Sequence, residues 1–395
     1  MANMIDYIRW RGDLSFTASP MNEVDSVLFV FLSFLDFSGI VPEYAEDGSV
    51  TLRDAVRICF AKDSLTKEKD AYYGAIMPNR DIFRMAKLMA SSERFGNVRL
   101  TAYQRIVCRD YEEQFAAYCA ICDDNSILVS FQGTDDSVVG WKEDLNLAIV
   151  DVIPGQRRSA EYLNSVASVL GGRIRVSGHS KGGNLAIYSA SKCNKDVQNR
   201  ILRVYNHDGP GFSRGFLESE DYLAIKEKVV KIVPEESIIG VIFESDKLAV
   251  VKSAKSGFNQ HNSFLWEVSG NHFVRRKELS RSSKELGRVL NEWLSETDTE
   301  TRRNVIDAIY ELISTENSMT LTDLSRDKTR LWKALVKLEP QKREFVFKAL
   351  TRVLSDMLKS MVRRSSDGSD CEGSDNSVLE QSAKKQKNKF LFKKG

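Results

Sequence analysis

The sequence predicts an α/β fold, built on a mostly parallel β-sheet with flanking helices and followed by an α-helical C-terminal region and a disordered tail. Short β-rich runs alternate with helical stretches over residues 111–272, which is the pattern of an α/β sheet. Beyond about Val274 glycine becomes rare and apolar residues recur at helical spacing. From about Arg363 the chain is rich in Ser, Asp and Gly and ends in lysine-rich sequence, a composition that cannot bury a core.

The size and charge of the chain indicate the class of protein. Its 395 residues exceed what one compact core usually holds, so we expect one large domain plus an addition. A composition of 42% hydrophobic and 28% charged residues is that of a soluble globular protein, and a net charge of +2 gives no reason to expect nucleic acid as a partner. The N-terminus lacks the layout of a signal peptide, and the most apolar run, Val27–Leu35, is too short for stable membrane insertion. We therefore expect a cytoplasmic protein.

The elements can be placed in order along the chain. Within residues 1–110, Val27–Leu35 is expected to form a core helix or strand, and helices are expected at Thr51–Lys62 and Asn79–Ser92. The strands expected in residues 111–272 are Phe115–Cys122, Ile127–Gln132, Ile174–Ser177, Ile201–Asn206, Lys228–Val233, Gly240–Phe243, Leu248–Lys252 and Phe264–Val268. Helices are expected between them at Ala160–Leu170 and Asn184–Lys192.

These elements predict three regions. Residues 1–272 form the α/β domain, with residues 1–110 as its N-terminal portion and 111–272 as its core. Residues 274–362 form a helical region that could dock a protein partner, and residues 363–395 form the disordered charged tail. Cys119 and Cys122 have the spacing of a metal or redox motif, but no second pair and no nearby histidine completes a ligand set, so we expect core thiols and no metal.

One short stretch carries the first sign of chemistry. In Gly178-His179-Ser180-Lys181-Gly182 a serine stands between two spaced glycines, after an apolar strand and before an apolar-patterned helix. A nucleophile elbow strains the serine backbone and admits only small residues two positions to either side. The helix that follows directs backbone N–H groups toward developing negative charge. We therefore interpret Ser180 as a catalytic nucleophile, with a structural Gly-rich turn as the alternative.

The motifs resemble a known group of enzymes. The segments VSGHSKGGNLA and SILVSFQGTDDSVVGWKEDLNLA are similar to the elbow and the upstream F-R-G-T and W-x-x-D motifs of class 3 lipases, which have the α/β-hydrolase fold. More closely, GWKEDLN, GHSKGGNLA, DGPGF and QHN resemble an uncharacterised bacterial family of lipase-like α/β hydrolases, over roughly residues 5–270. The resemblance implies an α/β-hydrolase sheet and a hydrolytic reaction, and it implies no particular substrate.

The FQGT segment is the candidate oxyanion hole. Thr134, at the end of a strand beside the elbow, can aim a backbone N–H and a hydroxyl at the substrate oxygen, and the backbone N–H of Lys181 would supply the second donor. Gln132 stands where the lipases carry arginine. Trp141 and Asp144 are expected to help hold this loop. The alternative is a strand-ending turn with an aspartate cap.

The base is sought among four histidines. His179 lies next to the nucleophile and is expected to pack against neighbouring loops, and His207 directly follows a strand. In α/β hydrolases the order is serine, acid and then a histidine on a late loop, which favours His261 over His272.

The acid is expected to be Asp208, which ends the strand after the elbow helix. Class 3 lipases carry the acid one strand later, where this chain has Lys231, so that position has lost its carboxylate. Structurally, Asp208 could instead cap the Gly-Pro-Gly turn that follows it. The other carboxylates that remain open as the acid are Glu235, Glu236, Glu244 and Asp246.

Together these residues predict a serine hydrolase that cleaves carboxylic esters, with lipid esters as one candidate class, through an acyl-enzyme and a Ser180–His261–Asp208 triad. The chemistry needs no metal and no organic cofactor. The same machinery cleaves amides and thioesters, so the bond type stays open. The side chain of Lys181, directly after Ser180, is expected at the pocket mouth or in solvent. The alternative function is an inactive α/β-hydrolase-like scaffold that binds a partner through its C-terminal helices.

Overall fold

The computed structural model of the protein describes residues 1–44, 46–61, 72–73, 77–135 and 137–313. The predicted tail at 363–395 and the part of the predicted helical region beyond residue 313 lie outside the described residues.

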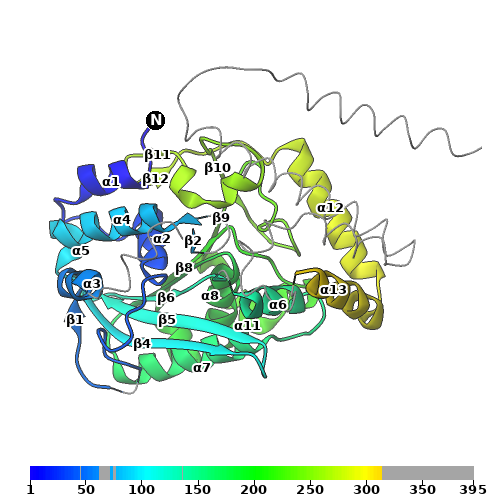
Figure 1. Ribbon diagram of the computed structural model, residues 1–395, viewed down its shortest axis with the longest axis horizontal. Coiled ribbons are helices and arrows are strands. Elements are labelled where there is room, and N and C mark those ends of the chain that lie inside the picture. Colours follow the sequence, from blue (N-terminus) through cyan, green and yellow to red (C-terminus); the bar gives the residue numbers. More distant parts are fainter. Residues whose placement is uncertain (45, 62–71, 74–76, 136, 314–395) are drawn as a thin grey trace, which may run out of the picture.

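An eight-stranded mixed sheet forms the centre of the fold, as Figure 1 shows. Its order is β1-β4-β5-β6-β7-β8-β9-β10, and the strands from β6 to β10 pair in parallel, whereas β1, β4 and β5 pair antiparallel. The strands are β1 (Val50–Thr51), β4 (Arg99–Cys108), β5 (Glu113–Ile121), β6 (Ile127–Phe131), β7 (Ile174–His179), β8 (Ile201–His207), β9 (Val229–Pro234) and β10 (Ala249–Val251). Four of the seven pairings are parallel, which confirms the predicted α/β fold with a mostly parallel sheet.

Helices cover both faces of this sheet. The N-terminal helices are α1 (Met4–Arg11), α2 (Glu23–Leu32), α3 (Leu52–Ala61), α4 (Asn79–Ser91) and α5 (Glu93–Gly96). They pack on one face, and α7 (Pro154–Val169) and α8 (Lys181–Lys192) pack on the other. Alternate side chains of β5 supply the two cores: Tyr118 and Ala120 face the N-terminal helices, and Ala117 and Cys119 face α7 and α8.

The apolar run that includes Val27 is the central helix of the first core. Every residue of α2 is buried, because the helix lies between the sheet and the other N-terminal helices. A helix that is apolar on all sides must be enclosed on all sides. Asn22 caps its N-terminus by accepting hydrogen bonds from the backbone N–H groups of Val24 and Asp25.

The remaining short elements connect the sheet. They are β2 (Tyr72–Tyr73), β3 (Met77–Pro78), α6 (Val138–Asn146), α9 (Lys195–Arg200), α10 (Arg214–Leu217), α11 (Glu220–Leu223), η2 (Lys226–Lys228), η3 (Gly257–His261), η4 (Ser263–Leu265), β11 (Val268–Ser269) and β12 (His272–Phe273). The elements β2 and β3 pair with each other, as do β11 and β12.

Two predicted strands differ in the structure, and one observed strand was not predicted. The strand expected at Gly240–Phe243 is a turn, in which the N–H of Ile242 bonds the carbonyl of Ile239. The strand expected at Phe264–Val268 begins as the 3₁₀ turn η4, which Asn262 caps through a side-chain hydrogen bond. The long strand β4 was absent from the prediction, since its outer half alternates with exposed polar residues at the antiparallel side of the sheet.

Two helices follow the sheet at its carboxyl side, α12 (Arg281–Glu296) and α13 (Thr299–Ile313). Their apolar spacing predicted helices here. The carboxylate of Asp307 accepts from the ammonium of Lys142 on α6 at 2.7 Å, and Arg302 donates to the carbonyl of Ala148 at 2.9 Å. The C-terminal helices therefore dock on the α/β domain. Among the described residues, no helix is both long and apolar enough to cross a membrane.

Candidate active site

Ser180 lies at the sharp turn between β7 and α8. Its backbone has φ 56° and ψ −129°, a conformation that L-residues adopt only under strain. The turn is tight because glycines let the backbones touch: a Cβ on Gly178 would lie 2.0 Å from the backbone of Gly182, and a Cβ on Gly182 would lie 2.4 Å from the carbonyl oxygen of Phe131. The serine is partly exposed, whereas its neighbours in the turn are buried. This is the backbone geometry of a nucleophile elbow.

His261 and Asp208 are hydrogen-bonded to each other. The Nδ1–H of His261, in η3, donates to Oδ2 of Asp208 at 2.7 Å, although the two residues are 53 positions apart. Asp208 directly follows β8 and adopts φ 51°, which aspartate tolerates better than most residues. Both side chains are buried. Because a carboxylate only accepts, the bond places a proton on Nδ1 and directs Nε2 away from Asp208.

Asp208 also lies against the elbow. The backbone N–H of Ser180 donates to the carbonyl of His207 at 3.0 Å, and a Cβ on Gly209 would lie 2.3 Å from the carbonyl oxygen of Ser180. The parallel strands β7 and β8 thus bring Ser180 and Asp208 to the same edge of the sheet, as the carboxyl ends of neighbouring strands require.

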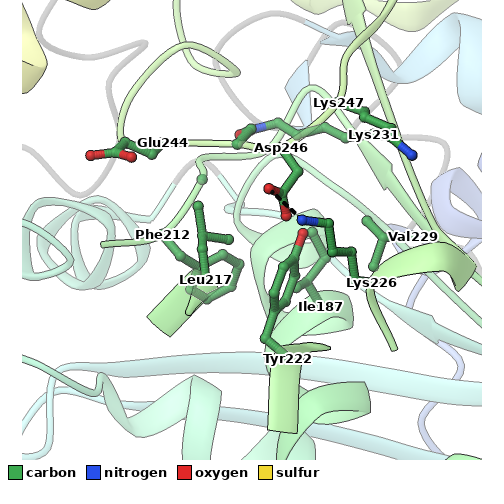
Figure 2. Close-up of a pocket in the computed structure, with 12 residues that line it drawn as sticks. Ile187, Phe212, Leu217, Tyr222, Lys226, Val229, Lys231, Glu244, Asp246 and Lys247 are labelled. Atoms are coloured by element: carbon green, nitrogen blue, oxygen red, sulfur yellow. Dashed lines mark hydrogen bonds and ion pairs between the residues drawn. The ribbon is translucent and has the colours of Figure 1, made fainter. Parts of the chain in front are cut away.

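The other carboxylates have different partners. Glu235 pairs with Arg276, Asp246 pairs with Lys226, and Glu236 accepts from the backbone N–H of Gly257. Glu244 lies on the rim of a pocket, and Figure 2 shows its carboxylate directed away from the Asp246–Lys226 pair. Of the five candidate acids, Asp208 is the one that the structure joins to His261.

Lys231 occupies the position on β9 where the sequence had suggested a lost acid. Its buried ammonium donates to the hydroxyl of Ser245 at 2.8 Å. Burial lowers the pKa of Lys231 to about 7, and the nearby negative charge of Asp208 partly opposes this shift. Lys231 lines the small pocket of Figure 2 together with Ile187, Gly211, Phe212, Leu217, Tyr222, Lys226, Val229, Glu244, Ser245, Asp246 and Lys247. Neither Ser180 nor His261 lines it.

The other histidines serve the packing around the site. The Nε2–H of His179 donates to the backbone carbonyl of His261 at 2.8 Å, and the two rings lie 4.5 Å apart. Burial lowers the pKa of His179 well below its ordinary value, so its ring is neutral. His207 donates to Ser26, and burial lowers its pKa to about 3. His272 is exposed in β12. His179 thus packs against the loop that carries His261, as the sequence predicted.

The oxyanion-hole candidates lie beside the elbow. A Cβ on Gly133 would lie 3.4 Å from the Cβ of Ser180, so the segment after β6 lies directly beside Ser180. The hydroxyl of Thr134 donates to Oδ2 of Asp144 at 2.5 Å. That bond uses the hydroxyl hydrogen, so the backbone N–H is the remaining donor of Thr134. Lys181 is the first residue of α8, where a backbone N–H has no carbonyl within its own helix to bond.

Asp144 lies on α6 with its carboxylate inside the protein. Burial raises the pKa of Asp144 to about 6, and the ammonium of Lys181 opposes the shift. Its hydrogen bond from Thr134 joins α6 to the segment that follows β6. Trp141 lies one turn earlier on α6, half-buried, and its indole N–H has no hydrogen-bond partner among the described residues.

The side chain of Lys181 is where the sequence expectation was wrong. It was expected at the pocket mouth or in solvent, but it is wholly buried. Its ammonium donates to Glu143 at 2.7 Å and to the backbone and side-chain carbonyls of Gln114, each at 2.7 Å. The Lys181 side chain turns into the protein because its acidic partner, Glu143, is buried there.

Sequence reasoning missed three residues of the site. Glu143 and Gln114 hold the Lys181 ammonium, and the hydroxyl of Ser237 donates to Oδ1 of Asp208 at 2.5 Å. The sequence did offer a signal for Glu143, since this residue lies inside the WKED motif. Nothing in the sequence around Ser237 or Gln114 points to these contacts, because they join segments far apart in the chain.

The paired cysteines do not form a site. Cys119 lies in the core under α7 and α8, and Cys122 lies in the core under the N-terminal helices, so the two thiols face opposite sides of the sheet. Both are free and buried, and burial raises the pKa of Cys119 to about 12. Within the described parts of the chain, no cluster of three or more His, Cys, Asp or Glu side chains could hold a metal ion.

Two solved structures resemble the chain in fold. One is a fungal lipase in complex with an inhibitor, 15% identical over 55% of this chain and 84% of that chain, with a TM-score of 0.33. The other is M37 lipase, 10% identical over 84% of this chain and 97% of that chain, with a TM-score of 0.33. No curated protein matches the chain.

A family model does match. The matched segment, residues 89–311, begins near the end of α4 and extends through α12 into α13, whereas the motifs place the resemblance over residues 5–270. The C-terminal helices that the sequence had set apart are thus included in the match. The match covers more than half of the chain, and the protein therefore belongs to the Mbeg1-like family.

Proposed function

We propose that the protein is a serine hydrolase that cleaves carboxylic esters, lipid esters among the candidates, through an acyl-enzyme. The observation that carries the proposal is the hydrogen bond from His261 to Asp208 beside a serine with φ 56°. A buried carboxylate that orients an imidazole next to a strained serine is the arrangement that activates a hydroxyl nucleophile. A structural turn needs neither the pair nor the strain.

The residues divide the reaction between them. Ser180 Oγ attacks the ester carbonyl carbon while Nε2 of His261 accepts the hydroxyl proton, and Asp208 stabilises the imidazolium. The backbone N–H groups of Thr134 and Lys181 hold the negative charge on the former carbonyl oxygen. The tetrahedral intermediate then expels the alcohol, which takes the proton from His261. Water repeats the sequence to release the carboxylic acid and restore Ser180.

A fluorophosphonate probe tests this proposal, because it reacts covalently with activated serines. The purified full chain should be labelled, and Ser180→Ala, His261→Ala and Asp208→Asn should lower the labelling rate by about 10³-fold or more. His272→Ala is the matched control, since this histidine is exposed and outside the site, and it should be labelled like the wild type. A folded wild type that is not labelled would contradict the proposal and favour the alternative of an inactive scaffold.

A further inference from the structure

The carboxylate of Asp208 is held at both of its oxygens. Oδ2 accepts from His261, and Oδ1 accepts from the hydroxyl of Ser237 at 2.5 Å. Asp208 is fully buried and Ser237 is 1% exposed. A carboxylate with a donor at each oxygen cannot rotate about its last bond without losing one of them. The plane of the Asp208 carboxylate, and with it the orientation of the His261 ring, thus depends on where Ser237 lies.

The turn around Ser237 is built to present its hydroxyl. The backbone N–H of Gly240 donates to Ser237 Oγ at 3.0 Å, so the hydroxyl hydrogen is free to point to Asp208. A Cβ on Gly240 would lie 2.4 Å from Oδ1 of Asp208. The turn therefore approaches the carboxylate so closely that only glycine fits at this position.

Helix α12 forms hydrogen bonds with the turn around Ser237. The hydroxyl of Ser283, in the first turn of α12, donates to the backbone carbonyl of Ser237 at 2.5 Å. Further along the helix, the amide oxygen of Asn291 accepts from the backbone N–H of Phe243 at 2.7 Å. A Cβ on Gly287 would lie 3.1 Å from Val241, so the helix lies directly against the turn. Hydrogen bonds thus connect α12 to Asp208 through a single intermediate residue.

The same helix also packs against the segment that carries the histidine. Leu286 of α12 is buried in a small apolar cluster with Ile238 and Phe258. The ring of Phe258 stacks beside the ring of His261, with centroids 6.0 Å apart and planes at 26°. One helix therefore supports both members of the Asp208–His261 pair, from positions outside the sheet (Figure 1).

We propose that Ser237 is a positioning residue for the Asp208–His261 pair and that α12, through Ser283, sets the place of Ser237. The contacts above support the placement of Ser237, and its expected effect on the labelling rate rests on the proposed hydrolase function. It assigns the C-terminal helical region a role within the site.

The test compares Ser237→Ala with wild type in the full chain. Its first readout is the rate of fluorophosphonate labelling as a function of pH. Removing the donor leaves more negative charge on Asp208, which favours the protonated imidazole. Labelling by Ser237→Ala should therefore slow by about 10-fold, with the lower limb of its pH profile moved to higher pH. His179 and Asp144 near His261, and Lys231 near Asp208, stay in place in this variant, so the shift reports the loss of the hydroxyl.

The second readout does not depend on activity. With only four histidines, the Nδ1 proton of His261 can be assigned by NMR in ¹⁵N-histidine-labelled protein. In the wild type this proton should exchange slowly with water, and in Ser237→Ala it should exchange about 10-fold faster, because the carboxylate that accepts it can rotate. His272 is exposed and serves as the internal reference. If the wild type is not labelled at all, the hydrolase proposal fails, and the exchange rate alone decides the positioning role.

Three further single variants show whether the effects come from the loss of the Ser237 hydroxyl. Ser237→Thr keeps the hydroxyl and should restore both readouts, and the exposed Ser168→Ala should change neither. Ser283→Ala should slow labelling about 3-fold, the size expected for one hydrogen bond, and should add little to Ser237→Ala in the double variant. Wild-type exchange and an unchanged pH profile in Ser237→Ala would overturn the proposal, as would fully additive effects of the two serines on labelling.

Discussion

Glu143 is the residue that joins Lys181 of the elbow, Gln114 of β5 and Gly155 of α7. One carboxylate oxygen accepts from the ammonium of Lys181 and from the backbone N–H of Gln114, and the other accepts from the backbone N–H of Gly155 at 2.8 Å. The Lys181 and Glu143 side chains are wholly inaccessible to solvent. Taking two charges out of water offsets most of their attraction, but removing only one partner leaves a buried charge without compensation.

Lys181→Met should therefore destabilise the protein by about 3–5 kcal/mol, measured by urea unfolding. The double variant Lys181→Met with Glu143→Gln should lose less than the sum of the two single variants, because no uncompensated charge remains. Lys247→Ala removes the exposed ion pair with Glu227 and is the control, with an unchanged unfolding midpoint. Strict additivity in the double variant would show that the pair is not coupled.

His207 makes the stability of the protein depend on pH. Its pKa is lowered to about 3 by burial, against about 6.5 for an unfolded histidine. Above about pH 6.5 His207 is neutral in both the folded and the unfolded chain, and it then takes nothing from the free energy of unfolding. As the pH falls below 6.5 the unfolded chain binds a proton that the folded chain excludes, and each pH unit then removes up to about 1.4 kcal/mol until the pH reaches about 3.

Urea unfolding of His207→Gln between pH 7 and pH 4 should show a shallower loss of stability than the wild type, because the amide does not titrate and its nitrogen can still donate to Ser26. His179, whose pKa burial also lowers, contributes in the same direction and remains in the variant. The control is His272→Gln at an exposed position, with the slope of the wild type. An equal slope in His207→Gln would contradict the assignment.

At the scale of elements, the elbow depends on backbone-to-backbone contact between β7, α8 and the end of β6. A side chain at Gly178 would overlap the first turn of α8, and one at Gly182 would overlap the carbonyl of Phe131. These contacts are why the strand-turn-helix unit needs glycine at both positions, independently of any chemistry at Ser180. The local sequence was therefore sufficient to locate it.

Gly178→Ala should greatly reduce the yield of folded protein or lower the thermal midpoint strongly, since a Cβ at 2.0 Å from backbone atoms forces β7 and α8 apart. Gly215→Ala in α10 is the matched control, because no atom lies within 4 Å of its Cβ position. That variant should melt at or slightly above the wild-type temperature. Circular dichroism melts of both proteins test this, and a wild-type midpoint for Gly178→Ala would mean that the elbow is packed differently.

At the scale of the whole molecule, the N-terminal segment and the family segment share one hydrophobic core. Residues before 89 lie outside the family match, yet α2 contacts β6, β7 and β8. The ring of Phe31 stacks on Phe264 with centroids 5.0 Å apart and lies 5.2 Å from the ring of His179, which in turn holds the His261 loop. The N-terminal helices thus cover one face of the sheet, and through Phe31 they pack against residues beside the site.

A chain that begins at residue 89 should not fold on its own, because the apolar face of the sheet that includes Tyr118 and Leu128 would be exposed. We expect aggregation on expression and the loss of cooperative thermal unfolding. Phe31→Ala in the full chain should fold but lose about 3–5 kcal/mol. A soluble, cooperatively unfolding protein from residues 89–395 would instead make the N-terminal segment a separate unit.

The sequence was sufficient for those parts of the fold and the site whose chemistry is local. The strand-turn-helix around Ser180 and the alternation of β5 follow from neighbours in the chain, and so does the place of His261 in a late polar loop. The strand expected at Gly240–Phe243 failed for the opposite reason. Val241 lies against Gly287 of α12 and the backbone N–H of Phe243 donates to Asn291 of that helix, and β-propensity does not register such partners.

Local pattern thus determined the class of fold, the elbow and the candidate residues Ser180, Asp208 and His261. Only the folded chain joined Asp208, one of five candidate carboxylates, to His261, sent the Lys181 side chain inward to Glu143, and brought Ser237, which Ser283 of α12 contacts, to the other oxygen of the Asp208 carboxylate. The physical reason is that backbone conformation and periodic burial are properties of neighbouring residues. The partner of a buried charge or hydroxyl is chosen by segments that meet only when the sheet and its covering helices have assembled.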